Sequence, residues 1–374
     1  MTIKGATQLG LVSLLAVMVC SMSACQSKVM PTIEADKLAL GQKLYFDAAL
    51  SEPAGQSCAS CHLSTAGFAD PDRELPVSRG IDPAHFGNRN TSTTAYVSFT
   101  PEFHFDDTEG LYIGGFFHDG RAHTLEEQAK APFLNPLEMA NPDQESVVRK
   151  VAQGDYAALF EEVYGKGAFD NVDQAYDHIA DAIANFERSD FFSPFTSKYD
   201  YYLRGKAQLT EQELRGLEIF EDESKGNCAA CHPSSIAEDG TLPLFTDYSY
   251  DNLGVPKLAD SPFYQVDPKH NPEGAAVIDL GLGGVLNVSA ENGKFKVSTL
   301  RNIAATPPYM HNGIFSTLRE VVEFYNSRDT DSRWGEPEVN ENVNHDELGD
   351  LGLTEQEVDD IVAFMLTLSD GYRP

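Results

Sequence analysis

Two short motifs place reactive side chains at a fixed spacing. Residues 58–62 read CASCH and residues 228–232 read CAACH, so both have the form C-x-x-C-H. Two thiols at this spacing reach the two vinyl groups of one haem, and the histidine that follows falls beneath the iron. A zinc site, a redox dithiol or a disulfide would use the thiols but would not require a histidine after each pair. The sequence therefore predicts two covalent c-type haems, attached through Cys58, Cys61, Cys228 and Cys231 and ligated by His62 and His232.

The elements around the motifs read as helices and long loops. A helix is expected before each motif, over residues 37–46 and 211–221, and apolar residues at helical spacing indicate two more, over 172–186 and 358–368. Sustained period-2 alternation is scarce, and residues 69–94 and 238–293 are rich in Gly, Pro, Asp and Asn, which predicts long loops. Capping-box pairs mark four helix starts: Thr124 with Glu127, Thr210 with Glu213, Thr317 with Glu320, and Thr354 with Glu357. The expected fold class is all-α.

Composition and charge narrow the class of protein. A chain of 374 residues with 41% apolar residues is large enough for two domains, and its net charge of −31 argues against nucleic-acid partners. Residues 11–19 form an apolar run that is too short to span a bilayer, and they precede the sequence MSAC, which ends at Cys25. We expect residues 1–25 to be a signal peptide and the protein to be periplasmic. Cys25 is either lipidated or incidental. If it is lipidated, the lipid would be the protein's only contact with the membrane.

Two longer segments carry a resemblance to a known family. Residues 118–139 (HDGRAHTLEEQAKAPFLNPLEM) and 296–325 (KVSTLRNIAATPPYMHNGIFSTLREVVEFY), together with both haem motifs, resemble the bacterial di-haem cytochrome c peroxidases and their relative MauG. The resemblance runs from about Leu40 to the C-terminus. It implies two cytochrome c-like domains, over 33–200 for the peroxidatic haem and 205–372 for the electron-transfer haem, with the haems near the domain interface.

The resemblance also implies an activity and two distal residues. The expected reaction is reduction of hydrogen peroxide to water, with electrons from a small cytochrome or cupredoxin. Glu138 and Gln128 match the family's distal residues, Glu138 as the group that moves a proton and Gln128 as the group that orients peroxide, while Pro132 shapes the pocket. From its neighbours alone, Glu138 reads equally as a solvated acid.

The second haem and a calcium site follow from the same resemblance. Tyr325 falls where the family places that haem's distal ligand, with Met310 as a rival, although a buried tyrosine at this spacing also reads as core. A tyrosine there is typical of MauG, which oxidises a protein or organic substrate through a high-valent iron state. A calcium site is implied at Asn90 and the carbonyls of Thr306 and Pro308.

Two positions depart from the family pattern. His118 stands where the family has a tryptophan between the haems, which leaves its part in electron transfer open. The family members that need reductive activation carry a distal histidine where this sequence has Asp82, with His85 close by. The first haem is therefore expected to be five-coordinate without activation. The remaining alternative of another class is an electron-transfer protein without catalytic activity.

Overall fold

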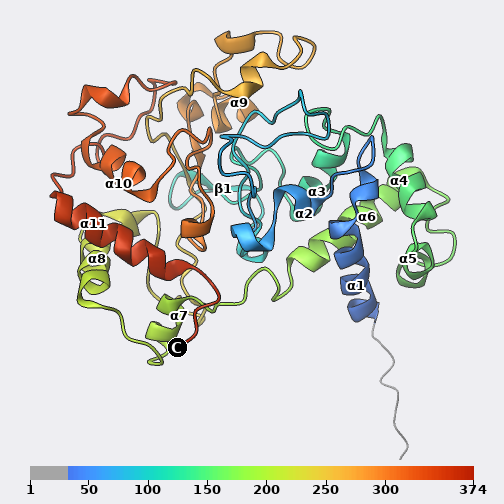
Figure 1. The fold of residues 1–374 in the computed structure, drawn as a ribbon, viewed down its shortest axis with the longest axis horizontal. Coiled ribbons are helices and arrows are strands. Elements are labelled where there is room, and N and C mark those ends of the chain that lie inside the picture. The colour runs from blue at the N-terminus through green and yellow to red at the C-terminus, as the bar shows by residue number, and fades with distance from the viewer. Residues whose placement is uncertain (1–32) are drawn as a thin grey trace, which may run out of the picture.

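The computed structural model describes residues 33–374 (Figure 1). The expected signal peptide over residues 1–25, with Cys25, lies outside these residues. Among the helices of residues 33–374, none combines the length and the apolar character needed to span a bilayer.

The described chain is mainly helical, as predicted, and its strands form two short antiparallel pairs, β1 with β2 and β3 with β4. The helices are α1 (Ile33–Phe46), α2 (Cys58–Cys61), α3 (Leu125–Leu134), α4 (Gln144–Gln153), α5 (Ala157–Tyr164), α6 (Val172–Glu187), α7 (Lys198–Leu203), α8 (Glu211–Glu221), α9 (Leu282–Leu286), α10 (Leu318–Ser327) and α11 (Glu355–Met365). The strands are β1 (His104–Asp106), β2 (Leu111–Ile113), β3 (Tyr250–Asp251) and β4 (Phe295–Lys296).

The helix that precedes the first motif packs against α6, the longest helix of residues 33–374. Leu40 and Leu44 of α1 are buried, as are Ile183 and Phe186 of α6, and these residues belong to one apolar cluster. The two helices approach so closely at Gly41 that a Cβ there would lie 1.9 Å from the carbonyl oxygen of Ala182. Only glycine fits this contact, which fixes the position of α1 just before residues 58–62.

The second motif is positioned in the same way. Helix α8 lies beside α11 (Figure 1), and a Cβ at Gly216 would lie 1.9 Å from the carbonyl oxygen of Asp360. Each glycine also faces a phenylalanine four residues further along the partner helix, Phe186 in α6 and Phe364 in α11. The two halves of the chain therefore repeat one helix pair, and the first helix of each pair precedes a C-x-x-C-H motif.

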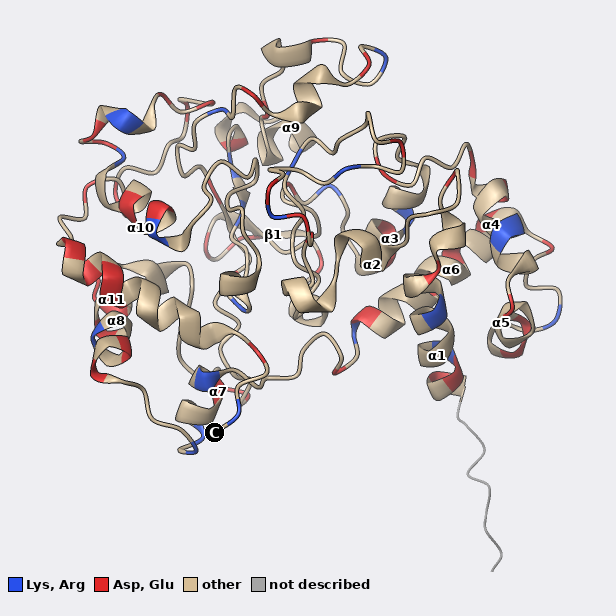
Figure 2. Cartoon of the chain, viewed as in Figure 1, with Lys and Arg blue, Asp and Glu red and all other residues tan. Residues whose placement is uncertain are grey.

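Each half has its own apolar cluster, one between Leu40 and Phe192 and one between Tyr199 and Leu368. Polar contacts join the halves. Arg89 forms a two-pronged ion pair with Asp279, both bonds being 2.7 Å long. The hydroxyl of Tyr96 donates to the carboxylate of Asp370 at 2.9 Å. Acidic residues occur in α5, α8 and α11 (Figure 2), so the negative charge is not confined to one segment.

Most local predictions agree with the structure. Reciprocal capping boxes form at Thr210, Thr317 and Thr354. At α3 the hydroxyl of Thr124 accepts from the backbone N–H of Glu127, whose carboxylate accepts instead from the backbone of His123. Residues 69–94 contain no helix or strand, as predicted. The prediction of an unbroken loop over 238–293 is wrong, because β3 and α9 lie within it; both are too short to show a periodic pattern.

Candidate active site

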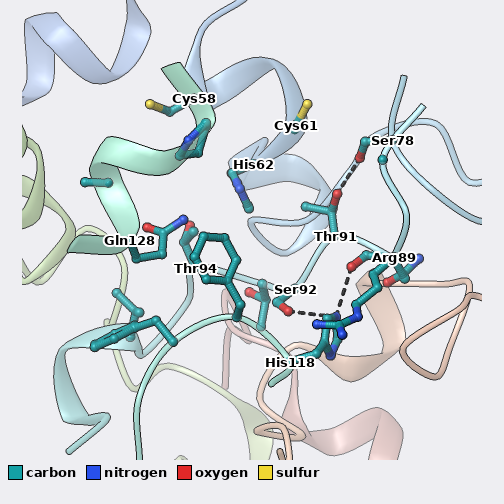
Figure 3. Close-up of a pocket in the computed structure, with 18 of the residues that line it drawn as sticks. Cys58, Cys61, His62, Ser78, Arg89, Thr91, Ser92, Thr94, His118 and Gln128 are labelled. Carbon is teal, nitrogen blue, oxygen red and sulfur yellow. Dashed lines mark hydrogen bonds between the residues drawn. The ribbon is translucent and has the colours of Figure 1, made fainter. Parts of the chain in front are cut away.

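Each C-x-x-C-H motif lies in the wall of its own cavity. The first cavity is lined by Cys58, Cys61 and His62, and the second by residues 228, 231 and 232 of the other motif. All four thiols are free. Because the two pairs line different cavities, the four thiols do not converge on one tetrahedral site. This arrangement argues against a zinc site with four cysteine ligands. Figure 3 shows Cys58, Cys61 and His62 around the first cavity.

The two motif histidines are held in one tautomer by matching contacts. Nδ1 of His62 lies 3.2 Å from the carbonyl oxygen of Phe68, and Nδ1 of His232 lies 2.7 Å from that of Phe245. A carbonyl oxygen only accepts, so Nδ1 carries the proton and Nε2 keeps a free lone pair. Burial lowers the pKa of both histidines, which keeps the rings neutral. Both rings are thus prepared as iron ligands.

The two residues whose carbonyls accept these hydrogen bonds share an unusual backbone conformation. Phe68 has φ 62° and Phe245 has φ 53°, in the left-handed region that phenylalanine rarely adopts. Each conformation turns the carbonyl oxygen toward the motif histidine. Strain of this kind persists where the surrounding structure requires it, so the repeated feature supports one function for both motifs. The sequence offered no signal for either contact.

Covalent haem attachment also fits the state of the thiols. Burial raises the pKa of Cys61, Cys228 and Cys231 to about 12, and that of Cys58 well above its usual range. These groups are therefore neutral thiols within apolar cavities, and each pair is accompanied by a neutral imidazole. The donor set suits a c-type haem in each cavity, held by the residues that the sequence predicted.

The predicted distal residues meet in the first cavity. Gln128 and Pro132 lie four residues apart on α3 and line the cavity together with Glu138, which lies in the turn after that helix. Gln128 points toward the cavity in Figure 3. The side-chain amide of Asn135 donates to Oε1 of Glu138 at 2.8 Å, while burial raises the pKa of Glu138 above its ordinary value. A carboxyl with raised proton affinity therefore lines the same cavity as His62.

His118 lies in the wall between the cavities. It lines both of them, as do residues 90–93 and 296–299. Its Nε2 lies 2.9 Å from both the carbonyl oxygen of Asn90 and the hydroxyl of Ser92 (Figure 3). Burial lowers the pKa of His118 to about 4, so the ring is neutral and Nε2 donates to the carbonyl. The position that sequence reasoning left open is thus a fixed, neutral imidazole between the two motifs.

The second cavity holds both candidate distal ligands. Tyr325 of α10 and Met310 line it together with His232. Burial raises the pKa of Tyr325 well above its usual range, with the nearby Cys228 and Cys231 as the next causes. Its side chain is partly buried, and among residues 33–374 no hydrogen bond engages its hydroxyl, which leaves the oxygen free on the side of the cavity. The unpartnered oxygen favours a ligand role over a core role.

The predicted calcium residues share a cavity. Asn90, Thr306 and Pro308 all line the second cavity. The side-chain amide of Asn90 donates to the carbonyl oxygen of Pro76 at 3.0 Å, which leaves its own oxygen available. Among residues 33–374, no cluster of three or more His, Cys, Asp or Glu side chains is placed to hold a metal ion. A cation here would therefore rely on amide and carbonyl oxygens.

Asp82 and His85 do not line either cavity. Nδ1 of His85 lies 3.0 Å from the carbonyl oxygen of Pro136, and its ring packs edge-on against His270, with ring centroids 5.0 Å apart. Sequence reasoning missed Glu187, the last residue of α6, which lines the first cavity and is 4% exposed. A signal existed, because Glu187 lies four residues after Ile183 on the apolar face of that helix.

Comparisons with known proteins agree with this geometry. Residues 35–208 match a family model described as di-haem cytochrome c peroxidase. The chain is 40% identical to the methylamine utilization protein MauG of Paracoccus denitrificans (strain Pd 1222), over 90% of this chain and 89% of that protein. It is 31% identical to the cytochrome-c peroxidase IdrP1 of Pseudomonas sp. (strain SCT), over 90% of this chain and 81% of that protein. The crystal structure of the diheme peroxidase BthA from Burkholderia thailandensis E264 superposes with a TM-score of 0.81 at 34% identity, over 89% of this chain and 86% of that one.

Proposed function

Since this chain belongs to the di-haem cytochrome c peroxidase family, whose members are oxidoreductases that carry two haems, we propose that it reduces hydrogen peroxide to water. The observation that carries the proposal is the first cavity. There Glu138, with a raised pKa, and Gln128 line the same space as the prepared ligand His62. A protein that only transfers electrons would have no use for a buried proton acceptor at this place.

The residues of the first cavity have separate roles in the proposed reaction. A bound haem would supply the redox chemistry, with its iron held by His62 and its ring by Cys58 and Cys61. Glu138 takes a proton from one peroxide oxygen and returns it to the oxygen that leaves as water. The amide of Asn135 holds Oε1 of Glu138 in place at 2.8 Å, and Gln128 presents its own amide to the substrate.

The second half of the chain receives the electrons. We propose that a small cytochrome or cupredoxin donates them to the haem held by residues 228–232, and that His118, in the wall between the cavities, lies on the path to the first haem. Two domains, over 33–200 and 205–372, with a calcium ion at Asn90 beside their interface, fit the separate apolar clusters of the two halves. A periplasmic location, which the signal-peptide pattern of residues 1–25 favours, is part of the proposal, with or without a lipid on Cys25.

Replacement of the distal carboxyl tests the proposal. The substitution Glu138→Gln keeps the shape of the side chain but removes its proton acceptor, so peroxide consumption with a reduced small cytochrome should fall roughly 10²–10⁴-fold. The matched control is Glu145→Gln, which neutralises an exposed acid in the first turn of α4. An unchanged rate in Glu138→Gln would contradict the role of Glu138, and a wild type that consumes no peroxide would favour an electron-transfer protein without catalytic activity.

One observation favours a second candidate function. The unpartnered hydroxyl of Tyr325 in the second cavity fits an oxygen ligand, and the relative at 40% identity is a methylamine utilization protein. In that case the electrons that reduce peroxide would come from a protein or organic substrate, which the enzyme oxidises. A small redox protein would not be the donor. Peroxide consumption measured with reduced cytochrome, and separately with a protein substrate, distinguishes the two activities.

A further inference from the structure

Glu187 is a buried acid for which the mechanism above has no role. It ends α6 and is 4% exposed, and its Oε2 atom has no hydrogen-bond partner among residues 33–374. It lines the first cavity together with Ile183, one helical turn earlier. A buried carboxyl without a partner costs stability that an apolar side chain would not cost. A purely structural role therefore explains Glu187 poorly.

Glu187 forms no ion pair among residues 33–374, although Arg188 is the next residue. The neighbouring Arg188 is turned to the surface and engages Glu126 of α3 through bonds of 2.6 and 3.1 Å. The hydroxyl of Tyr45, on α1, donates to the carbonyl oxygen of His62. The end of a helix carries partial negative charge, which further opposes an anion. The groups that face Glu187 are thus Tyr45, Cys58, Glu126 and Arg188, with Glu138 in the same cavity wall.

These contacts decide the protonation state. Burial, with a smaller contribution from Glu126, raises the pKa of Glu187 to about 8, against the opposing effect of Arg188. The side chain is therefore a neutral carboxylic acid at neutral pH, and a neutral acid is able to donate its proton. The next residue, Arg188, has a side chain that is 42% exposed. Glu187 thus lines the first cavity at the end of a helix whose next residue has an exposed side chain.

The proposed reaction needs such a donor. One hydrogen peroxide, two electrons and two protons give two waters, with the electrons supplied by the small redox protein. Glu138 only moves a proton that peroxide already carries, so the two additional protons must enter a buried cavity from outside. We propose that Glu187 is the residue that passes these protons to the first cavity, which rests on the proposed peroxide reduction. Glu187 gives up its proton toward the cavity and regains one from solvent at the surface end of α6.

The substitution Glu187→Gln tests this role, because glutamine keeps the size and neutrality of the side chain but has no proton to exchange. We expect peroxide turnover by the haem-loaded enzyme to fall roughly 10²-fold, the low end for a proton-transfer group. Wild-type turnover should decline as pH rises through about 8, where Glu187 loses its proton, and the variant should lack that decline. Glu187→Asp, which restores a carboxyl, should recover part of the rate. Asp177→Asn, an exposed acid on the same helix, is the control.

A second measurement does not depend on activity. Infrared spectra of the haem-loaded wild type should show the carbonyl band of a buried protonated carboxyl, which disappears above about pH 8 and is absent from Glu187→Gln. If wild type consumes peroxide and Glu187→Gln keeps its rate and pH profile, the inference is overturned while the proposed function stands. If wild type consumes no peroxide with any donor, the proposed function fails, and the role of Glu187 fails with it.

Discussion

Replacing Glu187 by glutamine should change how the stability of the protein depends on pH. The pKa of Glu187 is raised from its ordinary value of 4.5 to about 8 in the folded protein, mainly by burial. Between these values the unfolded chain has released the proton while the folded protein retains it. The folded state therefore loses stability as pH rises through this window and loses no more above it.

The magnitude follows from the two pKa values. One pKa unit corresponds to about 1.4 kcal/mol, so the full change between pH 4.5 and pH 8 is roughly 5 kcal/mol. Glutamine does not titrate, so the free energy of unfolding of Glu187→Gln, relative to wild type, should increase by up to this amount across the window. Below pH 4.5 both forms of the residue are neutral, and the two proteins should differ little.

Denaturant unfolding of the haem-loaded proteins, followed by circular dichroism at several pH values from about 4.5 to about 9, measures the difference. The ionic strength is held constant, because screening changes charge interactions. Asp177→Asn serves as the control, since Asp177 is exposed and pairs with Lys130 at the surface. A difference between Glu187→Gln and wild type that stays constant over this range would refute the reasoning, because Glu187 would then have an ordinary pKa.

Two further predictions concern the second cavity and its wall. Tyr325→Phe removes the unpartnered hydroxyl, so the absorption and paramagnetic-resonance signals of the second haem should change while those of the first haem stay the same. Met310→Leu should leave the signals of both haems unchanged. The reverse result would identify Met310 as the ligand. Asn90→Ala should lower the midpoint of thermal unfolding of the calcium-loaded protein, because it removes an oxygen ligand, and added calcium should no longer stabilise the variant. If calcium stabilises wild type and variant equally, Asn90 does not bind the cation.

Sequence alone predicted the parts of the molecule that depend on local pattern. The helices at residues 211–221 and 172–187, and the capping boxes at Thr210, Thr317 and Thr354, follow from spacing and side-chain chemistry, and the structure contains them. The segment 282–286 was predicted as loop but is a helix of one turn, because five residues are too few to show an amphipathic period.

The candidate site was predictable where a motif carried it, and not where tertiary contacts decide. The two C-x-x-C-H motifs, Gln128 and Glu138 could be found in the sequence, and the structure brings the last two to the first motif. The carbonyl partners Phe68 and Phe245 depend on a left-handed backbone that no residue type announces. Glu187 lies on the apolar face of α6, which the spacing from Ile183 indicates, but a glutamate in a helix is ordinarily solvated and only the packing of α6 shows that this one is buried.

The most direct test of the account is the mass of the mature protein, because every proposed role depends on two covalently attached haems. The protein is purified from cells with an intact system for haem attachment and is measured by intact mass spectrometry. If both haems are attached, the mass should equal that of the processed polypeptide plus two haems. Replacement of Cys58 and Cys61 together by alanine should lower the number of attached haems by one. Free thiols at residues 58, 61, 228 and 231, with no attached haem, would contradict the account.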